Sequence, residues 1–149
     1  MESANRDFFL NNIRIVNRQL SLDNIQEDVK TFRHNVELGG FIDLEEKIIN
    51  TRVSVVIHND DKEEVLGSLN VDFSYTISDF DTVFARNKVD KAAAEDILKV
   101  VAQESMAAMR GIMFENFRGT LLHNAYLPII STSNFGKQLL TEPIVKKAR

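Results

Sequence analysis

Side chains capable of acid–base or metal chemistry are few and scattered. The chain contains three histidines, His34, His58 and His123, and no cysteine. No two histidines have the H-x-x-x-H spacing of ligands on one helix face, and the absence of thiolates excludes the common zinc motifs. We therefore expect each histidine to have a structural or surface role, with no bound metal.

Acidic residues form two short clusters, Glu45-Glu46 and Asp60-Asp61 with Glu63-Glu64. Neither has the glycine-containing twelve-residue pattern of a calcium loop, so both are interpreted as solvated turns. The sequence also lacks a nucleophile elbow, a P-loop and a dinucleotide-binding fingerprint. These absences favour a protein that is not an enzyme and that uses no cofactor.

The composition is that of one ordinary globular domain covering residues 1–149, with 44% hydrophobic and 27% charged residues. A net charge of −4 argues against a large nucleic-acid interface, which needs a basic face. No apolar run approaches the roughly 18 residues that cross a bilayer, and the N-terminal sequence MESANRDFF does not resemble a secretory signal. Together with the absence of cysteine, these features predict a soluble cytoplasmic protein without membrane insertion.

The first half of the chain has the alternating pattern of β-strands. Between Val65 and Ile77 the odd positions are mostly apolar and the even positions mostly polar, and residues 49–57 alternate in the same way. Turn-forming residues 59–62 separate these strands, which predicts an antiparallel hairpin. Residues 32–38 and 13–22 predict two further strands, and a change of phase near Val16 predicts a β-bulge there.

The second half changes to helical periodicity from Lys91 to Phe117. Its apolar residues cover an arc of roughly 220°, about twice what a helix on one sheet needs. The excess predicts burial against a second copy of the chain, in or beneath an interface that contains Val101, Ser105, Ala108 and Ile112. Met106, Met109 and Met113 lie near one side of the helix, where a core or an adaptable interface would place them. Gly119 is expected to end the helix in a left-handed conformation.

Apolar residues near the helix exceed what one sheet and one helix can bury, and exposed apolar patches of that size mark interaction sites. They are Phe41, Phe114, Phe117, Tyr126 and Phe135, with Leu121, Leu122, Leu127, Ile129 and Ile130.

The expected fold class is α+β: a four-stranded antiparallel sheet, one long helix, a loop containing Leu127-Pro128 and a short terminal helix over about residues 134–140. This order resembles the SecB family of export chaperones over nearly the whole chain. The matching segments are RIVNRQLSLD (14–23), NVEL (35–38), VSVV (53–56), SYTI (74–77), AQESMAAMRG (102–111), LPI (127–129) and NF (134–135).

The resemblance implies an ATP-independent holding chaperone that binds unfolded polypeptide clients. It also implies a homotetramer, formed as a dimer of dimers with the long helices packed between dimers. The client groove would be lined by the second strand, the crossover loop and a terminal lid helix. By position, these client-binding residues are Phe32, Val36, Leu38, Leu127, Ile129, Phe135, Leu139 and Leu140.

In the family, acidic residues on the solvent face of the sheet dock the basic, zinc-bearing tail of the SecA motor. The matching positions here are Gln19, Asp23 and Ser68, of which only Asp23 is acidic, and the chain ends in the basic sequence VKKAR. We therefore expect weak or absent binding to SecA.

Other functions stay open at this point. A SecB-like protein can instead guard the antitoxin of a toxin–antitoxin system. A small-ligand-binding or enzymatic α+β domain could use the same cleft, and a buried polar constellation within it would favour that alternative. A purely structural assembly subunit would have no free apolar groove.

Overall fold

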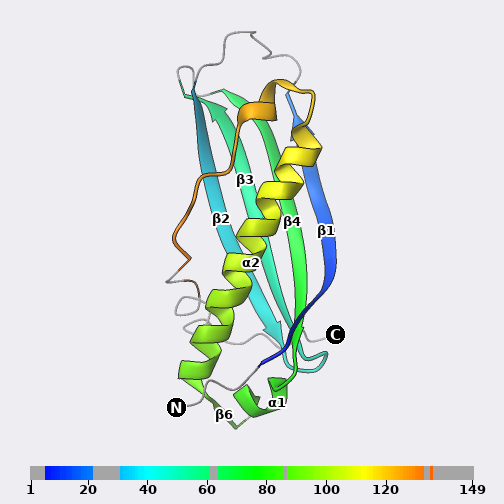
Figure 1. Ribbon diagram of the computed structural model, residues 1–149, viewed down its shortest axis with the longest axis vertical. Helices are drawn as coiled ribbons and strands as arrows, with labels where there is room; N and C mark the ends of the chain where they lie inside the picture. Colours follow the sequence, from blue (N-terminus) through cyan, green and yellow to red (C-terminus); the bar gives the residue numbers. More distant parts are fainter. Residues whose placement is uncertain (1–5, 22–30, 61–63, 86, 133–134, 136–149) are drawn as a thin grey trace.

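The computed structural model describes residues 6–21, 31–60, 64–85, 87–132 and 135. The α+β prediction is confirmed: one long helix, α2 (Lys91–Phe117), lies across one face of a four-stranded antiparallel sheet (Figure 1). The strands are β1 (Phe8–Leu20), β2 (Phe32–Asp43), β3 (Ile48–Asn59) and β4 (Val65–Ile77). Their spatial order is β1-β4-β3-β2, so β1 and β2 form the two edges of the sheet.

The predicted hairpin of β3 and β4 forms the centre of the sheet. Val53 pairs with Val71 and Thr51 with Phe73, and all four side chains are buried beneath α2. The alternation departs from the prediction only at the start of β4, where Val65 is exposed and Leu66 is buried. The cause is a register shift next to His58, which inserts one extra residue into β4.

The predicted bulge in β1 is confirmed. Ile15 pairs with Val71 and Asn17 pairs with Asn70, the next residue of β4, so Val16 is left without a cross-strand partner. The strand begins at Phe8, five residues before the predicted start at residue 13. Most of its residues are exposed, because α2 packs on β3 and β4 rather than over this edge.

Strand β2 continues to Asp43, beyond the predicted end at Leu38. The sequence pattern breaks at Gly39-Gly40, because glycine weakens the signal of a strand. The structure gives the reason for the second glycine: a Cβ atom on Gly40 would lie 2.3 Å from the backbone oxygen of Asn50 in β3. Only glycine permits this close approach of the two backbones.

Helix α2 has the predicted bounds. The Asp90 side chain accepts a hydrogen bond from the Ala93 amide at 3.2 Å and caps the N-terminus. Gly119 has a φ of 75°, which confirms the left-handed residue just after the C-terminal end. Val100, Ala107 and Phe114 are not covered by the sheet, so part of the predicted surplus of apolar helix surface is present in the single chain.

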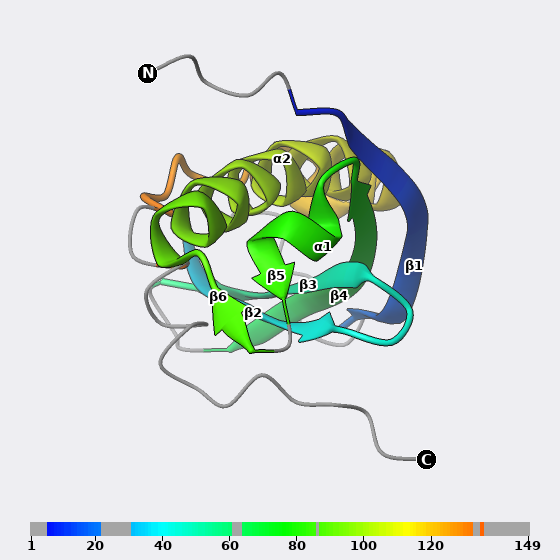
Figure 2. The ribbon, with the colours of Figure 1, turned by 90° about the horizontal axis from the view of Figure 1, so that it is seen from below.

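Smaller elements that the sequence did not predict close one end of the sheet (Figure 2). They are α1 (Phe80–Val83), β5 (Phe84–Ala85) and β6 (Lys88–Val89), while the 3-10 turn η1 (Leu121–Asn124) follows α2 at the other end. Arg6 donates to both carboxylate oxygens of Asp79 at 2.8 and 2.9 Å and ties the N-terminal segment to this end. Of the predicted terminal helix, only Phe135 lies within the described residues.

None of the helices in the described ranges is both long enough and apolar enough to cross a membrane.

Candidate functional site

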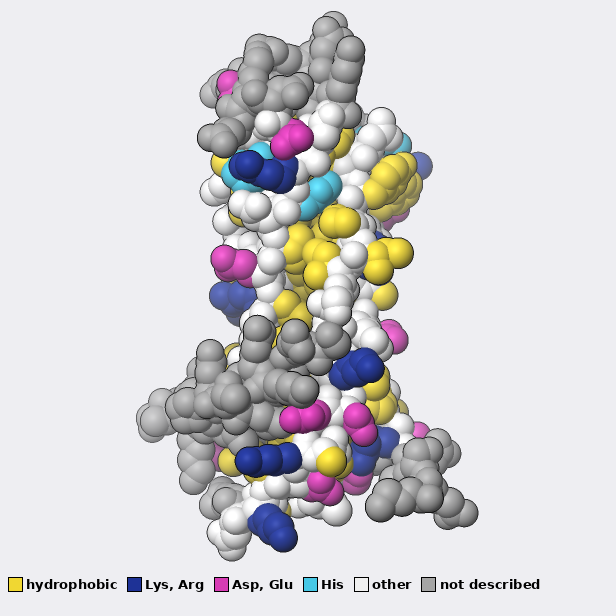
Figure 3. Space-filling view, turned by 90° about the vertical axis from the view of Figure 1, so that its left-hand side faces the viewer, with side chains coloured by type: hydrophobic (Ala, Val, Ile, Leu, Met, Phe, Trp, Pro, Cys, Tyr) yellow, Lys and Arg dark blue, Asp and Glu magenta, His cyan; other side chains and the backbone are white. Residues whose placement is uncertain are grey.

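The loop after η1, residues 125–132, runs beside edge strand β2, which is where the resemblance to the SecB family predicts the client groove (Figure 1). Phe32, Val36 and Leu38 lie half-buried on the helix side of β2, as predicted. Figure 3 views the molecule from this edge and shows hydrophobic side chains gathered along its middle. The His34 Nε2 atom lies 3.4 Å from the carbonyl oxygen of Ala125, and this contact holds the loop against the strand.

The most exposed apolar side chains of this region belong to the loop and to the nearby end of α2. Ile129 is 93% exposed, Tyr126 is 63% exposed and Phe114 is 42% exposed. A hollow of about 420 Å³ lies between the loop and α2, and it is lined by Ile129, Ile130, Ser131 and Thr132 of the loop and by Lys99, Gln103, Met106 and Arg110 of α2. This side of the molecule therefore presents aliphatic and aromatic surface that the described part of the chain leaves exposed.

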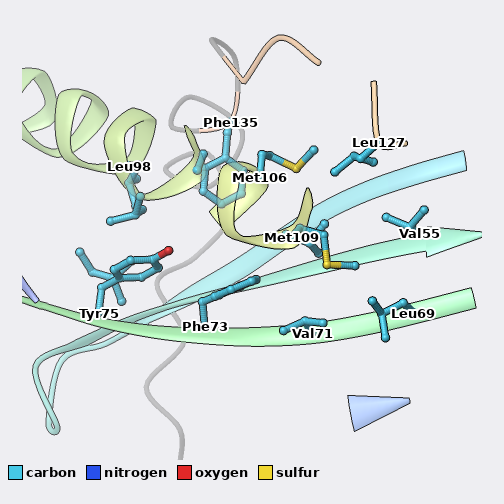
Figure 4. Packing of buried hydrophobic residues seen from close by; sticks show 14 of the residues in the cluster. Val55, Leu69, Val71, Phe73, Tyr75, Leu98, Met106, Met109, Leu127 and Phe135 are labelled. Atoms are coloured by element: carbon cyan, nitrogen blue, oxygen red, sulfur yellow. The ribbon is translucent and has the colours of Figure 1, made fainter. Parts of the chain in front are cut away.

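Two other residues predicted for the groove are buried. Leu127 and Phe135 are each only 5% exposed, and Figure 4 shows both in the core near Met106 of α2. They anchor the loop on the helix and offer little surface to a ligand in this conformation. Leu139 and Leu140 lie outside the described residues.

The four residues predicted for an oligomer interface divide into two pairs. Val101 and Ser105 are fully buried on the side of α2 that packs on the sheet, so they offer no surface to a second copy. Ala108 and Ile112 are half-buried at the border of the exposed side. The sequence could not separate the pairs, because helical periodicity shows which residues share a face but not what covers it.

A cluster of three hydroxyl groups lies at the centre of the interface between helix and sheet. Ser105 Oγ lies 2.6 Å from Thr51 Oγ1 and 2.8 Å from the Tyr75 hydroxyl oxygen, and it donates to the carbonyl oxygen of Val101 at 2.7 Å. Ser105 has one proton, so it must accept from both Thr51 and Tyr75. Burial raises the pKa of Tyr75, and the hydrogen bond to Ser105 opposes that rise.

The histidines do not come together as metal ligands. His34 contacts the loop, while His58 Nε2 on the outer face of β3 lies 3.3 Å from the amide nitrogen of Asn35. The His123 ring packs against Phe114, with the ring centres 5.5 Å apart. Within the described residues, no group of three histidine, aspartate or glutamate side chains is arranged to hold a metal ion.

The sequence reasoning missed a row of charged residues on the outer face of the sheet, the face without the helix. Gly39, Arg52, Asp72 and Arg14 are consecutive cross-strand partners from β2 to β1. Arg52 donates to Asp72 through Nε and Nη2, and Arg14 donates to the same carboxylate at 3.2 Å. These hydrogen bonds, that of Arg52 first, lower the pKa of Asp72. Three of the four are charged residues at polar positions of their strands and Gly39 lies beyond the predicted end of its strand, so only the register shows that they are neighbours.

Comparison of the sequence with models of protein families and with curated proteins found no match. These comparisons therefore identify no family, and the resemblance to the SecB family stays a prediction from the order of strands, helix and loop.

Two of the positions at which the resemblance to the SecB family would place SecA-docking acids lie side by side. Gln19 of β1 pairs with Ser68 of β4 on the outer face, and both side chains are uncharged. Asp23, the third position, lies outside the described residues.

Proposed function

We propose that this protein is an ATP-independent holding chaperone of the SecB type, which binds unfolded polypeptide in the groove between β2 and residues 125–132. The observation that carries the proposal is the 93% exposure of Ile129, in the loop that runs along β2, together with the half-buried apolar row Phe32, Val36 and Leu38 on the helix side of that strand. An aliphatic side chain in that position contributes nothing to the chain's own core. The exposure of this side chain supports the interpretation that a binding partner covers this surface.

The chemistry of the groove favours an extended apolar segment over a defined small molecule. Each Å² of apolar surface covered contributes roughly 25 cal/mol, so affinity accumulates along a client without any fixed sequence. Met106 lines the neighbouring 420 Å³ hollow between α2 and residues 129–132, and a methionine can repack against side chains of different shape. Neither a nucleotide nor a metal is needed for binding of this kind.

The small-ligand alternative has less support. The one buried polar constellation that we find in the described residues, Thr51, Tyr75 and Ser105, lies beneath α2, and its hydroxyls are bonded to one another. Such a cluster fixes the helix on the sheet instead of orienting a ligand in the groove. A chaperone for an antitoxin would use the same surface with a narrower set of clients.

Two exposed surfaces support assembly into a homotetramer, proposed here as a dimer of dimers. The outer side of α2 carries the small residues Ala107 and Gly111 beside half-buried Ile112, which permits close packing of another helix. The edge strand β1 exposes a second set of apolar side chains: Phe9, Leu10, Ile13, Ile15 and Val16. Exposed hydrophobic edges invite pairing or aggregation unless they are covered. The absence of cysteine supports a cytoplasmic location.

The test is suppression of aggregation of a chemically unfolded client, followed by light scattering without nucleotide. The double variant Tyr126→Ser, Ile129→Ser removes the most exposed apolar groups of the groove, and we expect at least a several-fold higher concentration for half-protection. The control is Val65→Ser, since Val65 is also exposed but pairs with His58 on the outer face. Equal loss in both variants, or protection only with added ATP, would contradict the proposal.

A further inference from the structure

The outer face of the sheet contains a second hollow, of about 540 Å³, on the side opposite α2. Its floor comprises the row Gly39, Arg52, Asp72 and Arg14 and the neighbouring row Phe41, Asn50, Ser74 and Asn12. Its volume falls within the range of roughly 300–1,000 Å³ that is typical of small-molecule sites. The hollow shares no lining residue with the hollow between α2 and residues 129–132, and it includes none of Phe32, Val36 and Leu38.

The charges in this hollow leave hydrogen-bond donors available. Asp72 accepts hydrogen bonds from both guanidinium groups, and Arg52 contributes Nε and Nη2 to it. Arg14 makes a single contact with Asp72, at 3.2 Å, and its side chain is 67% exposed. A guanidinium has five N–H donors, so Arg14 retains most of them for a ligand.

The other polar groups of the hollow point to the same ligand chemistry. Asp43 is engaged by the turn after β2, because its Oδ1 atom accepts the backbone amides of Glu45 and Glu46 at 3.0 and 2.9 Å. Asn50 accepts a hydrogen bond from Ser74 through Oδ1, so its side-chain N–H groups are available to donate to a ligand. The donors therefore favour an acceptor with negative charge, and carboxylate geometry matches a guanidinium.

Gly39 is the residue that keeps the hollow open, and the fold itself does not require glycine there. Its φ lies outside the left-handed region, and an added Cβ would meet no atom within 4 Å. Glycine within a strand costs roughly 0.5–1 kcal/mol relative to alanine. A side chain at position 39 would instead project between Phe41 and Arg52, into the space that a ligand would occupy.

We propose that this hollow binds a carboxylate attached to an apolar group. The carboxylate is held by Arg14 and by the amide N–H groups of Asn50, while Asp72 fixes both arginines in place. The ring of Phe41, which is 38% exposed, packs against the apolar part. Such a group occurs in a free aryl or alkyl carboxylic acid and at the C-terminus of a peptide that ends in an apolar residue.

The experiment uses the full chain labelled with ¹⁵N and 3-phenylpropionate as the probe, with chemical-shift changes followed to a concentration on the order of 10 mM. We expect saturable shifts at Arg14, Gly39, Phe41 and Arg52. The neutral probe 3-phenylpropionamide should bind at least about tenfold more weakly, since it lacks the charge that the guanidinium recognises. A peptide ending in phenylalanine, with a free or an amidated C-terminus, distinguishes a peptide ligand from a small acid.

Three variants test the residues. Arg14→Gln and Gly39→Val should each weaken binding at least about tenfold, and Gly39→Val should be no less stable to heat than the wild type. Arg18→Gln makes the same charge change on β1 at a position that pairs with Leu69 on the helix side, and its affinity should stay within about twofold. No saturable shifts, equal binding of the amide, or destabilisation by Gly39→Val would overturn the proposal.

Discussion

Replacing Ser105 by alanine is expected to destabilise the fold more than removing either hydroxyl that Ser105 binds. Ser105 donates its single proton to the carbonyl oxygen of Val101, 2.7 Å away, and accepts hydrogen bonds from Thr51 and Tyr75. The Ser105→Ala change therefore removes one acceptor and leaves two buried hydroxyl groups without a partner. All three side chains are at most 3% exposed, so water cannot replace the lost acceptor.

The magnitude follows from that count of unpaired groups. A buried donor left unsatisfied costs about 1–3 kcal/mol, so two of them should lower the free energy of unfolding by about 2–6 kcal/mol. The better helix propensity of alanine offsets roughly 0.5 kcal/mol of this loss in the free energy of unfolding. Thr51→Val keeps the side-chain shape and leaves Ser105 bonded to Tyr75 and Val101, so it should cost only about 0.5–1.5 kcal/mol.

The triple variant Ser105→Ala, Thr51→Val, Tyr75→Phe gives the sharpest comparison. It removes all three hydroxyls, leaves none unpaired, and should therefore be more stable than Ser105→Ala alone by about 1 kcal/mol or more. The measurement is urea unfolding followed by far-ultraviolet circular dichroism at one fixed protein concentration, since assembly also contributes to stability. Ser54→Ala, on the outer face of β3, is the control and should change stability by less than about 0.5 kcal/mol. If Ser105→Ala costs no more than Thr51→Val, the assignment of Ser105 as the shared acceptor is wrong.

Three further predictions concern assembly, partner choice and pH. Ala108→Asp should break a tetramer into dimers or smaller species in light scattering, because an unpaired charge buried in an interface costs several kcal/mol. The control Ala92→Asp, at the exposed start of α2, should leave the tetramer intact. A wild-type monomer at micromolar concentration would refute the assembly itself. The zinc-bearing tail of SecA should bind weakly or not at all in calorimetric titration. The double variant Gln19→Asp, Ser68→Glu should bind it more strongly at low salt, and this gain in affinity should shrink as ionic strength rises. Tight binding to the unmodified protein would contradict this expectation. The hydrogen bond from Arg6 lowers the pKa of Asp79 below its ordinary value of 3.8. The pair therefore stabilises the folded state above that pH, and the stabilisation is lost as the pH falls through the folded-state pKa. The difference in the free energy of unfolding between the wild type and Asp79→Asn should shrink as the pH is lowered, and a constant difference would show that charge is not involved.

Local rules were sufficient wherever one element's own residues decide its conformation. The bounds of α2, the left-handed Gly119, the β3–β4 hairpin and the bulge at Val16 all agree with the sequence, because caps, turns and alternation act over a few neighbouring residues. The extension of β2 past Gly39-Gly40 did not follow from those rules. It depends on how closely Gly40 approaches the backbone of β3, which is a contact between distant parts of the chain.

The sequence by itself determined the α+β class, the order of the four long strands and the long helix, and an apolar helix surface wider than one sheet covers. The tertiary structure decided which apolar residues stay uncovered: Leu127 and Phe135 are buried near α2, while Ile129 is left in solvent. It also decided that Ser105 faces the sheet, because the residues that a helix position contacts depend on the angle and rotation at which the helix packs on the strands. The row Gly39, Arg52, Asp72 and Arg14 likewise exists only through the register of four strands, since cross-strand neighbours far apart in the sequence carry no common local signal.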